Sequence, residues 1–169
     1  MEQALLARWV FERALAESRG FGLAVDESLS SHDRPWGGFL RIREESFPAF
    51  AAAYWEGVEI PHPAPGLRLD PKVLLVAPGA RLSLQFHHRR SELWRVLDGP
   101  VKIVTGSGAD DLTEKTYVPG DVLRLGLAEW HRLIGCDAWG RVAEIWQHAD
   151  CDNPSDENDI VRVEDDYGR

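Results

Sequence analysis

The chain has 169 residues, 44% of them hydrophobic, which is enough for the core of one domain. Its 28 acidic and 19 basic side chains leave a formal net charge of −9, which disfavours non-specific binding to nucleic acid or to an anionic membrane. The apolar runs are too short for a membrane span, two cysteines do not make a disulfide framework, and the first residues lack the pattern of a secretion signal, so we expect a soluble, cytoplasmic protein.

Two helices are predicted before the middle of the chain. In residues 2–18 apolar side chains recur near helical spacing among Glu and Arg, and Gly20 is a typical stop. In residues 47–56, Pro48 lies in the first turn and three alanines follow it. Gly57 comes directly after this range, so the pattern indicates a second, shorter helix. The prolines and glycine of residues 61–66 end this part of the chain.

From Leu67 onward, short runs with partial alternation of apolar and polar residues are separated by glycine or proline. The separators are Pro78-Gly79, Gly99-Pro100, Gly106 to Gly108, Pro119-Gly120, Gly126, Gly135 and Gly140. Such regular spacing predicts seven or eight short strands, and therefore an all-β sandwich or barrel. After His148 the sequence becomes polar and acidic, a composition typical of a solvated segment.

The candidate metal ligands are Gln85, His87, Glu92 and His131. If residues 81–87 form a strand, Gln85 and His87 project from the same face, because side chains alternate along a strand. Glu92 follows after a turn short enough to return a carboxylate to the same point, and His131 ends a later strand-like segment. Two imidazoles, a carboxylate and an amide oxygen suit zinc, manganese, iron or cobalt, so we expect one divalent metal, with zinc as first choice.

The remaining histidines have no partners at ligand spacing. His32, His62 and His148 lie beside acidic or proline-rich sequence, and we expect them at the surface. Pairing His148 with Cys151 as a second metal site has only weak support from their spacing.

The spacing around the four ligands resembles the two motifs of the cupin family. In the first motif the matching positions are Gly79, Gln85, His87, Glu92 and Gly99. The second runs from Gly120 to His131 with the same spacing, although Gly126, Ala128 and Gly135 depart from the usual residues. The resemblance implies a double-stranded β-helix, also called a jelly-roll barrel, with one or two N-terminal helices added. Residues 1–66 would lead into the barrel, 67–148 would form its core, and 149–169 would pack on it as part of one domain.

A longer segment, Leu82 to Trp94, resembles the type II phosphomannose isomerases. Other segments agree in order, namely Arg34 to Phe39, Asp70 to Val73, His131 to Leu133, Glu144 to Gln147 and Asp159 to Arg169. The resemblance implies a metal-dependent aldose–ketose isomerase that interconverts mannose 6-phosphate and fructose 6-phosphate in carbohydrate metabolism or polysaccharide biosynthesis. Family members often carry a guanylyltransferase domain ahead of the cupin, but no glycine-rich nucleotide loop precedes the barrel here, so guanylyl transfer is not expected.

The same resemblance suggests roles for residues around the metal. Arg90 matches an arginine that is catalytically important in the family, and a fixed positive charge can stabilise an enediolate or hold phosphate. A general base is also needed, for which Lys72 and His88 are the first candidates, with Glu144 and Asp159 as alternatives. For substrate binding we expect a sugar-stacking Trp36 and cationic groups from Arg34, Arg132, Arg162 and Arg169.

One departure keeps other functions open. The family commonly has histidine directly after the metal-binding glutamate, whereas this chain has Leu93. The alternatives are an isomerase of an unphosphorylated sugar such as lyxose or mannose, a non-catalytic cupin that binds sugar or metal and, more distantly, an iron dioxygenase. Cupin barrels often pair, so a homodimer is a further expectation.

Overall fold

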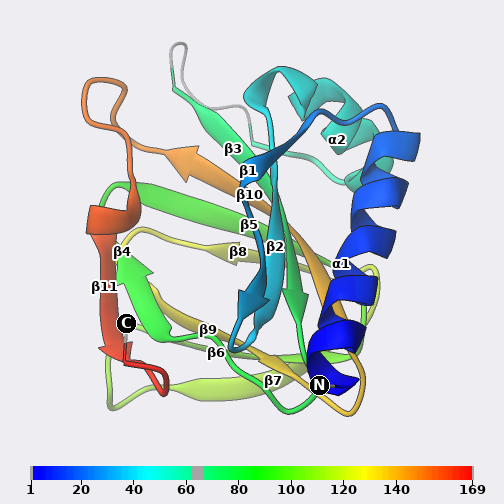
Figure 1. Cartoon of the computed structure of the whole chain (residues 1–169). Coiled ribbons are helices and arrows are strands. Elements are labelled where there is room, and N and C mark those ends of the chain that lie inside the picture. The colour runs from blue at the N-terminus through cyan, green and yellow to red at the C-terminus, as the bar shows by residue number, and fades with distance from the viewer. Residues whose placement is uncertain (1, 62–66, 169) are drawn as a thin grey trace.

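The computed structural model describes residues 2–61 and 67–168, which form two antiparallel sheets and two helices (Figure 1). The six-stranded sheet has, in spatial order, the strands β1 (Val25–Arg34), β2 (Gly37–Ile42), β3 (Leu69–Val76), β10 (Gly140–His148), β5 (Arg90–Asp98) and β8 (Val122–Leu125). The five-stranded sheet has β11 (Ile160–Glu164), β4 (Leu84–His87), β9 (Trp130–Gly135), β6 (Val101–Gly106) and β7 (Thr113–Tyr117). This is the all-β architecture expected from the sequence.

The helices cover the outer face of the six-stranded sheet. Helix α1 (Glu2–Gly20) packs against β1 and β2, and α2 (Phe47–Tyr54) follows the short 3-10 helix η1 (Glu44–Ser46) and packs against β3 (Figure 1). Both predicted helices are therefore confirmed, the second ending two residues earlier than expected. No described helix is long and apolar enough to cross a membrane.

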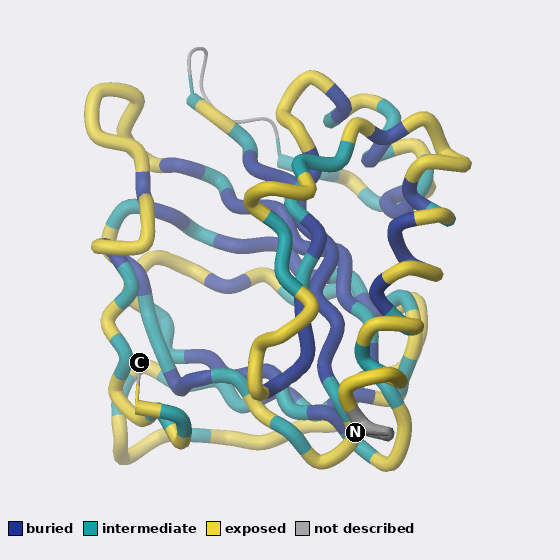
Figure 2. Tube along the Cα trace, viewed as in Figure 1, coloured by how far each residue is buried: buried dark blue, intermediate teal, exposed yellow. Residues whose placement is uncertain are grey.

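Two apolar clusters hold these layers together. One lies between the helices and the outer face of the six-stranded sheet and includes Phe11, Phe50 and Ile145. The other lies between the two sheets and includes Leu74 and Leu133. The central strands β3 and β10 are covered on both faces, which explains their nearly continuous buried residues in Figure 2. Burial of this kind stabilises the fold by roughly 25 cal/mol per Å² of apolar surface.

Strands from before residue 67 and from after residue 148 also belong to the two sheets. The hairpin of β1 and β2 was not foreseen, because residues 25–34 are mostly polar and lie on an exposed sheet edge. Its turn brings Gly37 so close to β3 that a Cβ atom there would lie 2.0 Å from the carbonyl oxygen of Leu75. Glycine at this position allows the hairpin, and with it Trp36, to sit against the barrel.

The C-terminal segment also belongs to the barrel. It forms the 3-10 helix η2 (Glu157–Asp159) and then β11, which pairs with β4 so that Ile160 lies opposite His87 and Arg162 opposite Gln85. Its solvated composition was misleading, because an edge strand buries only part of its side chains while its backbone still pairs. This pairing brings residues 155–162 next to the candidate metal ligands.

Candidate active site

Three of the four predicted metal ligands meet between the two sheets. His87 at the end of β4, Glu92 on β5 and His131 on β9 place ligand atoms within 4.8 Å of one another. His87 Nε2 lies 3.2 Å from Glu92 Oε1, and His131 Nε2 lies 3.5 Å from Glu92 Oε2. All three residues are almost completely buried.

The hydrogen bonding of His131 leaves a nitrogen ready for a cation. Its Nδ1 lies 2.9 Å from the carbonyl oxygen of Glu129, so Nδ1 carries the proton and donates it to that carbonyl. Its Nε2 is buried and has no hydrogen-bond partner among the described residues. A buried lone pair pointing at a carboxylate is costly unless a cation lies between them, so this cluster fits a divalent metal.

Gln85, the fourth predicted ligand, lies beside the cluster. It pairs with His131 in the strand register, and its Nε2 is 3.4 Å from His87 Nε2. Its Oε1 accepts a hydrogen bond of 2.7 Å from Ser83 Oγ. Turning the amide over would exchange its oxygen and nitrogen and present the oxygen to the cluster.

The charges of the cluster also suit a cation. Burial acts to raise the pKa of Glu92, but the positive charge of Arg90 and the nearby His131 and His87 hold this pKa well below its usual range. Burial lowers the pKa of His131 to about 4, although Glu92 acts in the opposite direction. At neutral pH the site therefore offers an ionised carboxylate and a neutral imidazole, the forms that bind metals.

Arg90 lies at the boundary between this cluster and a cavity. Its guanidinium donates from Nε to Glu92 Oε1 at 2.8 Å, lies with Nη2 3.0 Å from His87 Nε2, and donates from Nη1 to Ser155 Oγ at 2.9 Å. Its Cζ is 3.4 Å from the centroid of the Trp146 ring. Only 1% of Arg90 is exposed, so this positive charge is fixed by its contacts.

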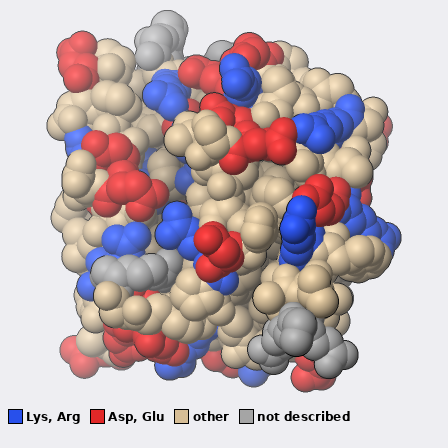
Figure 3. Space-filling model, in the orientation of Figure 1, with Lys and Arg blue, Asp and Glu red and all other residues tan. Residues whose placement is uncertain are grey.

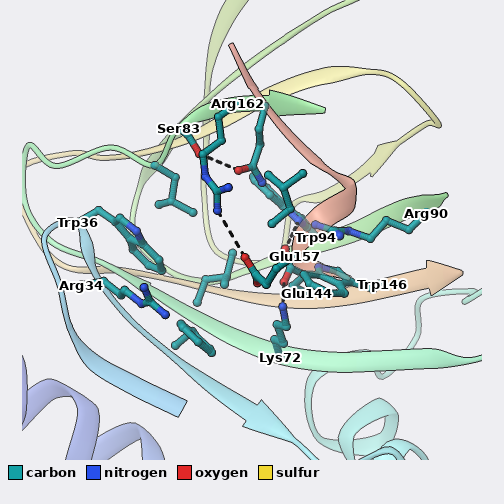
Figure 4. Close-up of a pocket in the computed structure, with 15 residues that line it drawn as sticks. Arg34, Trp36, Lys72, Ser83, Arg90, Trp94, Glu144, Trp146, Glu157 and Arg162 are labelled. Atoms are coloured by element: carbon teal, nitrogen blue, oxygen red, sulfur yellow. Dashed lines mark hydrogen bonds and ion pairs between the residues drawn. The ribbon is translucent and has the colours of Figure 1, made fainter. Parts of the chain in front are cut away.

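The cavity has a volume of about 230 Å³ and lies between the sheets. Figure 4 draws Arg34 and Trp36 on its left, Arg90 and Trp146 on its right, Arg162 above and Lys72 below. The structure thus brings seven of the candidate site residues to its wall, namely Arg34, Trp36, Lys72, Gln85, Arg90, Glu144 and Arg162.

Lys72 and Glu144 form a buried pair at this wall. Lys72 Nζ lies 4.0 Å from Glu144 Oε2 and 3.0 Å from the centroid of the Trp146 ring. Burial lowers the pKa of Lys72 to about 8, against the opposing effect of Glu144. Burial and the charge of Glu92 raise the pKa of Glu144. Both groups are thus able to exchange a proton near neutral pH.

Trp94 connects this pair to the metal cluster. Its indole Nε1 donates to Glu92 Oε2 at 3.0 Å and to Glu144 Oε1 at 3.1 Å. Trp94 and Trp146 are buried, as expected for core residues, yet both also line the cavity. The tryptophans therefore order the charged groups as well as filling space.

Besides Arg90, three cationic residues line the cavity of this acidic protein. Arg162 donates from Nη2 to Glu157 Oε2 at 3.5 Å, and its Nε is buried with no hydrogen-bond partner in the described part of the chain. Arg34 has its Cζ 5.6 Å from the Phe39 ring centroid, and Lys72 is the third cation. On the face drawn in Figure 3 basic and acidic side chains are interspersed, so that face offers no broad basic surface.

Other predicted site residues lie elsewhere. The side chain of His88 is exposed, packs edge-on against Phe86 and is not part of the cavity wall. Arg132 is buried, donates to the side chain and backbone of Glu164, and does not line the cavity either. Asp159, an alternative base, is engaged by backbone amides at the turn before Arg90. Arg169, like His62, is outside the described residues.

The expectation that His148 is a surface residue is wrong. It is 2% exposed, its Nε2 lies 3.0 Å from Asp70 Oδ2, and its Nδ1 accepts from the backbone amide of Ser155 at 2.9 Å. The polar residues after it in the sequence fold back over it. Ser155 and Glu157 were missed for the same reason, since no motif marks them and only the fold brings them to the site.

Sequence comparison adds the family. Residues 65–165 match the family model described as "Mannose-6-phosphate isomerase C-terminal". The xanthan biosynthesis protein XanB of Xanthomonas campestris pv. campestris is 39% identical over 106 residues, which are 62% of this chain and 21% of that protein. The alginate biosynthesis protein AlgA of Pseudomonas aeruginosa is 37% identical over 106 residues, 62% of this chain and 20% of that protein. The chain thus spans about a fifth of the length of these relatives.

Solved structures show the same fold. The capsular polysaccharide assembling protein CapF of Staphylococcus aureus matches with a TM-score of 0.53 at 16% identity, over 84% of this chain and 32% of that one. The oxalate decarboxylase of Lactobacillus farciminis also has a TM-score of 0.53, at 15% identity, over 84% of this chain and 34% of that one. At these identities the likeness concerns the fold alone, and it confirms the cupin barrel.

Proposed function

The chain belongs to the family of the mannose-6-phosphate isomerase C-terminal domain, as its motifs predicted, and we propose that it is itself a metal-dependent isomerase of a sugar phosphate. The observation that carries the proposal is the position of Arg90, which contacts two of the metal-ligand atoms and also lines a cavity with three other cations. Mannose 6-phosphate and fructose 6-phosphate are the proposed substrate pair.

The residues that would hold the metal are His87, Glu92, His131 and Gln85. A divalent cation there would supply a Lewis acid that stabilises negative charge on the sugar oxygens, and zinc is our first choice, with manganese, iron or cobalt as alternatives. The fit rests on the low pKa of Glu92 and on the buried Nε2 of His131, which has no hydrogen-bond partner within residues 2–61 and 67–168.

Lys72 is the proposed general base. Interconversion of an aldose and a ketose removes a proton from one of the carbons C1 and C2 and returns one to the other, through an enediol. Lys72 is at the cavity wall, and its lowered pKa leaves a substantial neutral fraction at about pH 8. Glu144, 4.0 Å away, can then exchange protons with the Lys72 amine. His88 is a weaker candidate, because its side chain is away from the cavity.

Arg90 is the proposed stabiliser of the enediolate. The His87 Nε2 lone pair that accepts from Arg90 Nη2 is the one a metal would use. Metal binding would therefore free Nη2 to donate to a sugar oxygen, while Nε stays on Glu92 and Nη1 on Ser155. A donor fixed in this way stabilises charge as it develops without reorganising.

Arg162 and Arg34 are the proposed phosphate ligands. Both line the cavity, and Arg162 has a buried Nε that finds no partner among the described residues and a weak contact to the exposed Glu157. Charge-assisted hydrogen bonds from two guanidinium groups would favour a phosphorylated over a free sugar. Trp36, which is 5% exposed and lies beside Arg34 in Figure 4, is proposed to contact the sugar ring.

The proposal is tested by incubating the metal-loaded protein with mannose 6-phosphate and measuring fructose 6-phosphate. Lyxose, mannose and their phosphates form the comparison panel, and the bound metal is quantified in the same preparation. Turnover of the phosphorylated hexose above all others is expected. Turnover of free sugars alone would mean that the substrate is an unphosphorylated sugar. Binding of metal and sugar without any turnover would overturn the enzymatic proposal.

A further inference from the structure

The C-terminal segment contacts Arg90 at a point that no motif marks. We propose that Ser155 is a positioning residue, which fixes the Arg90 guanidinium at the active site and is itself held by Asp159. This inference rests on the proposed function, since it takes Arg90 as the group that stabilises charge on the substrate. It extends the active site to a residue 65 positions further along the chain.

Ser155 contacts Arg90 directly. Ser155 Oγ accepts from Arg90 Nη1 at 2.9 Å and donates to Asp159 Oδ2 at 2.6 Å. A hydroxyl has a single proton, so its donation to Asp159 leaves only lone pairs for Arg90. Ser155 is 6% exposed and Arg90 1%, so water does not readily replace this acceptor.

Asp159 binds the backbone before Arg90 as well as the Ser155 hydroxyl. The same carboxylate accepts from the backbone amides of His88 at 3.2 Å and Arg89 at 3.0 Å. These amides form the turn that leads directly into Arg90. Asp159 therefore holds both the backbone before Arg90 and the hydroxyl at the end of its side chain.

His148, at the end of β10, holds the backbone of Ser155. Its backbone amide donates to His148 Nδ1 at 2.9 Å, and the other ring nitrogen of His148 lies 3.0 Å from Asp70. His148 is 2% exposed. The position of Ser155 is thus set by two independent hydrogen-bonded groups, Asp159 and His148.

The consequence concerns the direction of Nη2. When Nη2 turns to a substrate oxygen, Glu92 at Nε and Ser155 at Nη1 are the hydrogen-bond partners that remain, and the Trp146 ring still lies against the guanidinium. Because the ring gives no direction within the guanidinium plane, the two hydrogen bonds set where Nη2 points. Loss of the Ser155 hydroxyl would leave Nη1 without an acceptor, and the guanidinium would turn to find one. A displacement of about 1 Å is enough to lower a rate constant strongly.

The test compares Ser155→Ala with Ser18→Ala, which removes another buried hydroxyl, in α1, that contacts Tyr54 Oη at 3.3 Å. For Ser155→Ala we expect kcat to fall about tenfold, with KM and bound metal unchanged. In ¹⁵N NMR spectra we expect the Arg90 Nε–H and Nη–H protons to exchange at least about tenfold faster with solvent. Ser18→Ala should change neither kcat nor this exchange.

The two readouts separate the inference from the proposed function. If the unmodified protein does not isomerise any sugar, the proposed function fails, but the exchange of the Arg90 protons still tests the positioning role. Wild-type kcat and wild-type exchange in Ser155→Ala would overturn the inference. Asp159→Asn is a second variant in case Ser155→Ala does not fold; it weakens the acceptor for Ser155, so the same two changes are expected, and their absence would count equally against the inference.

Discussion

Glu92 and Leu93 are neighbours in the sequence but lie on opposite faces of β5. Glu92 points between the sheets, where it contacts His87, whereas Leu93 packs in the apolar cluster beneath the helices and is 3% exposed. A histidine at position 93 would therefore point away from the cavity of this protein. The main sequence-based reason for favouring a non-catalytic cupin does not apply to this fold.

Replacing Leu93 by histidine should consequently affect stability and not the metal site. An imidazole without a partner in this cluster is expected to lower the free energy of unfolding by about 3 kcal/mol. Leu93→Met, which conserves volume, should cost less than about 1.5 kcal/mol. Urea unfolding measures both values, and chelator competition measures metal affinity. Tighter metal binding by Leu93→His would show that position 93 reaches the metal after all.

Glu92→Gln should remove metal binding and destabilise the protein. The variant keeps the shape of the side chain but loses the charge that pairs with Arg90 at 2.8 Å. We expect metal affinity to fall at least about 100-fold and unfolding free energy to fall by about 3 kcal/mol, because Arg90 remains buried without a carboxylate. Glu114→Gln, which removes an exposed carboxylate paired with Lys102, is the control. An unchanged metal content in Glu92→Gln would refute the assignment of this ligand.

The pH dependence of catalysis should reveal Lys72. Folding lowers its pKa to about 8, and only the neutral amine can act as a base. The value of kcat/KM is therefore expected to rise with pH and to level off above about pH 8. Lys72→Met should lower it at least about 100-fold and abolish this rise, whereas Lys102→Met, at an exposed lysine, should change neither. If kcat/KM of Lys72→Met rose with pH in the same way, the rise would belong to a group other than Lys72.

Arg162 on β11 and Arg132 on β9 should differ in their effect on substrate binding. Arg162 lines the cavity, but Arg132 is directed at Glu164. For Arg162→Met we expect KM for the sugar phosphate to rise at least about tenfold, with little change for the free sugar. Arg132→Met should leave both KM values unchanged. Equal KM values for phosphorylated substrate in the two variants would exclude Arg162 as a phosphate ligand.

Asp70→Asn should destabilise the protein in a pH-dependent way. Burial acts to raise the pKa of Asp70, but hydrogen bonds and charge from His148, Arg41 and Arg68 lower it below the unfolded value of 3.8. Because the folded pKa is the lower one, its contribution is complete above about pH 4 and is lost as the pH falls towards the folded value. Urea unfolding between pH 3 and pH 7 should show a loss of about 3 kcal/mol at pH 7 that shrinks in acid.

An exposed aspartate provides the control for Asp70→Asn. Asp110→Asn, at an exposed carboxylate, should show no such loss at any pH in the same range. A difference between wild type and Asp70→Asn that grows as the pH falls would mean that folding raises the pKa of Asp70 instead.

The grouping of the candidate metal ligands His87, Glu92 and His131 could be predicted from the sequence because strand alternation and short turns are local. A spacing of two positions places Gln85 and His87 on one face of β4, and a short turn returns Glu92 beside them. The same alternation places Leu93 on the other face of β5, so the sequence itself indicates that position 93 faces away from Glu92. The two helices were predictable for an equally local reason, their apolar spacing and their end signals.

The contacts that hold Arg90 from the C-terminal segment were decided only by the tertiary structure. Ser155, Asp159 and His148 take part in them because β11 pairs with β4 and because the segment after β10 folds back, and neither pairing has a local sequence signal. The structure likewise separates Arg162 from Arg132, although both are arginines in segments that resemble the family. Local spacing determined which residues can share a face, and long-range packing decided which faces enclose the site.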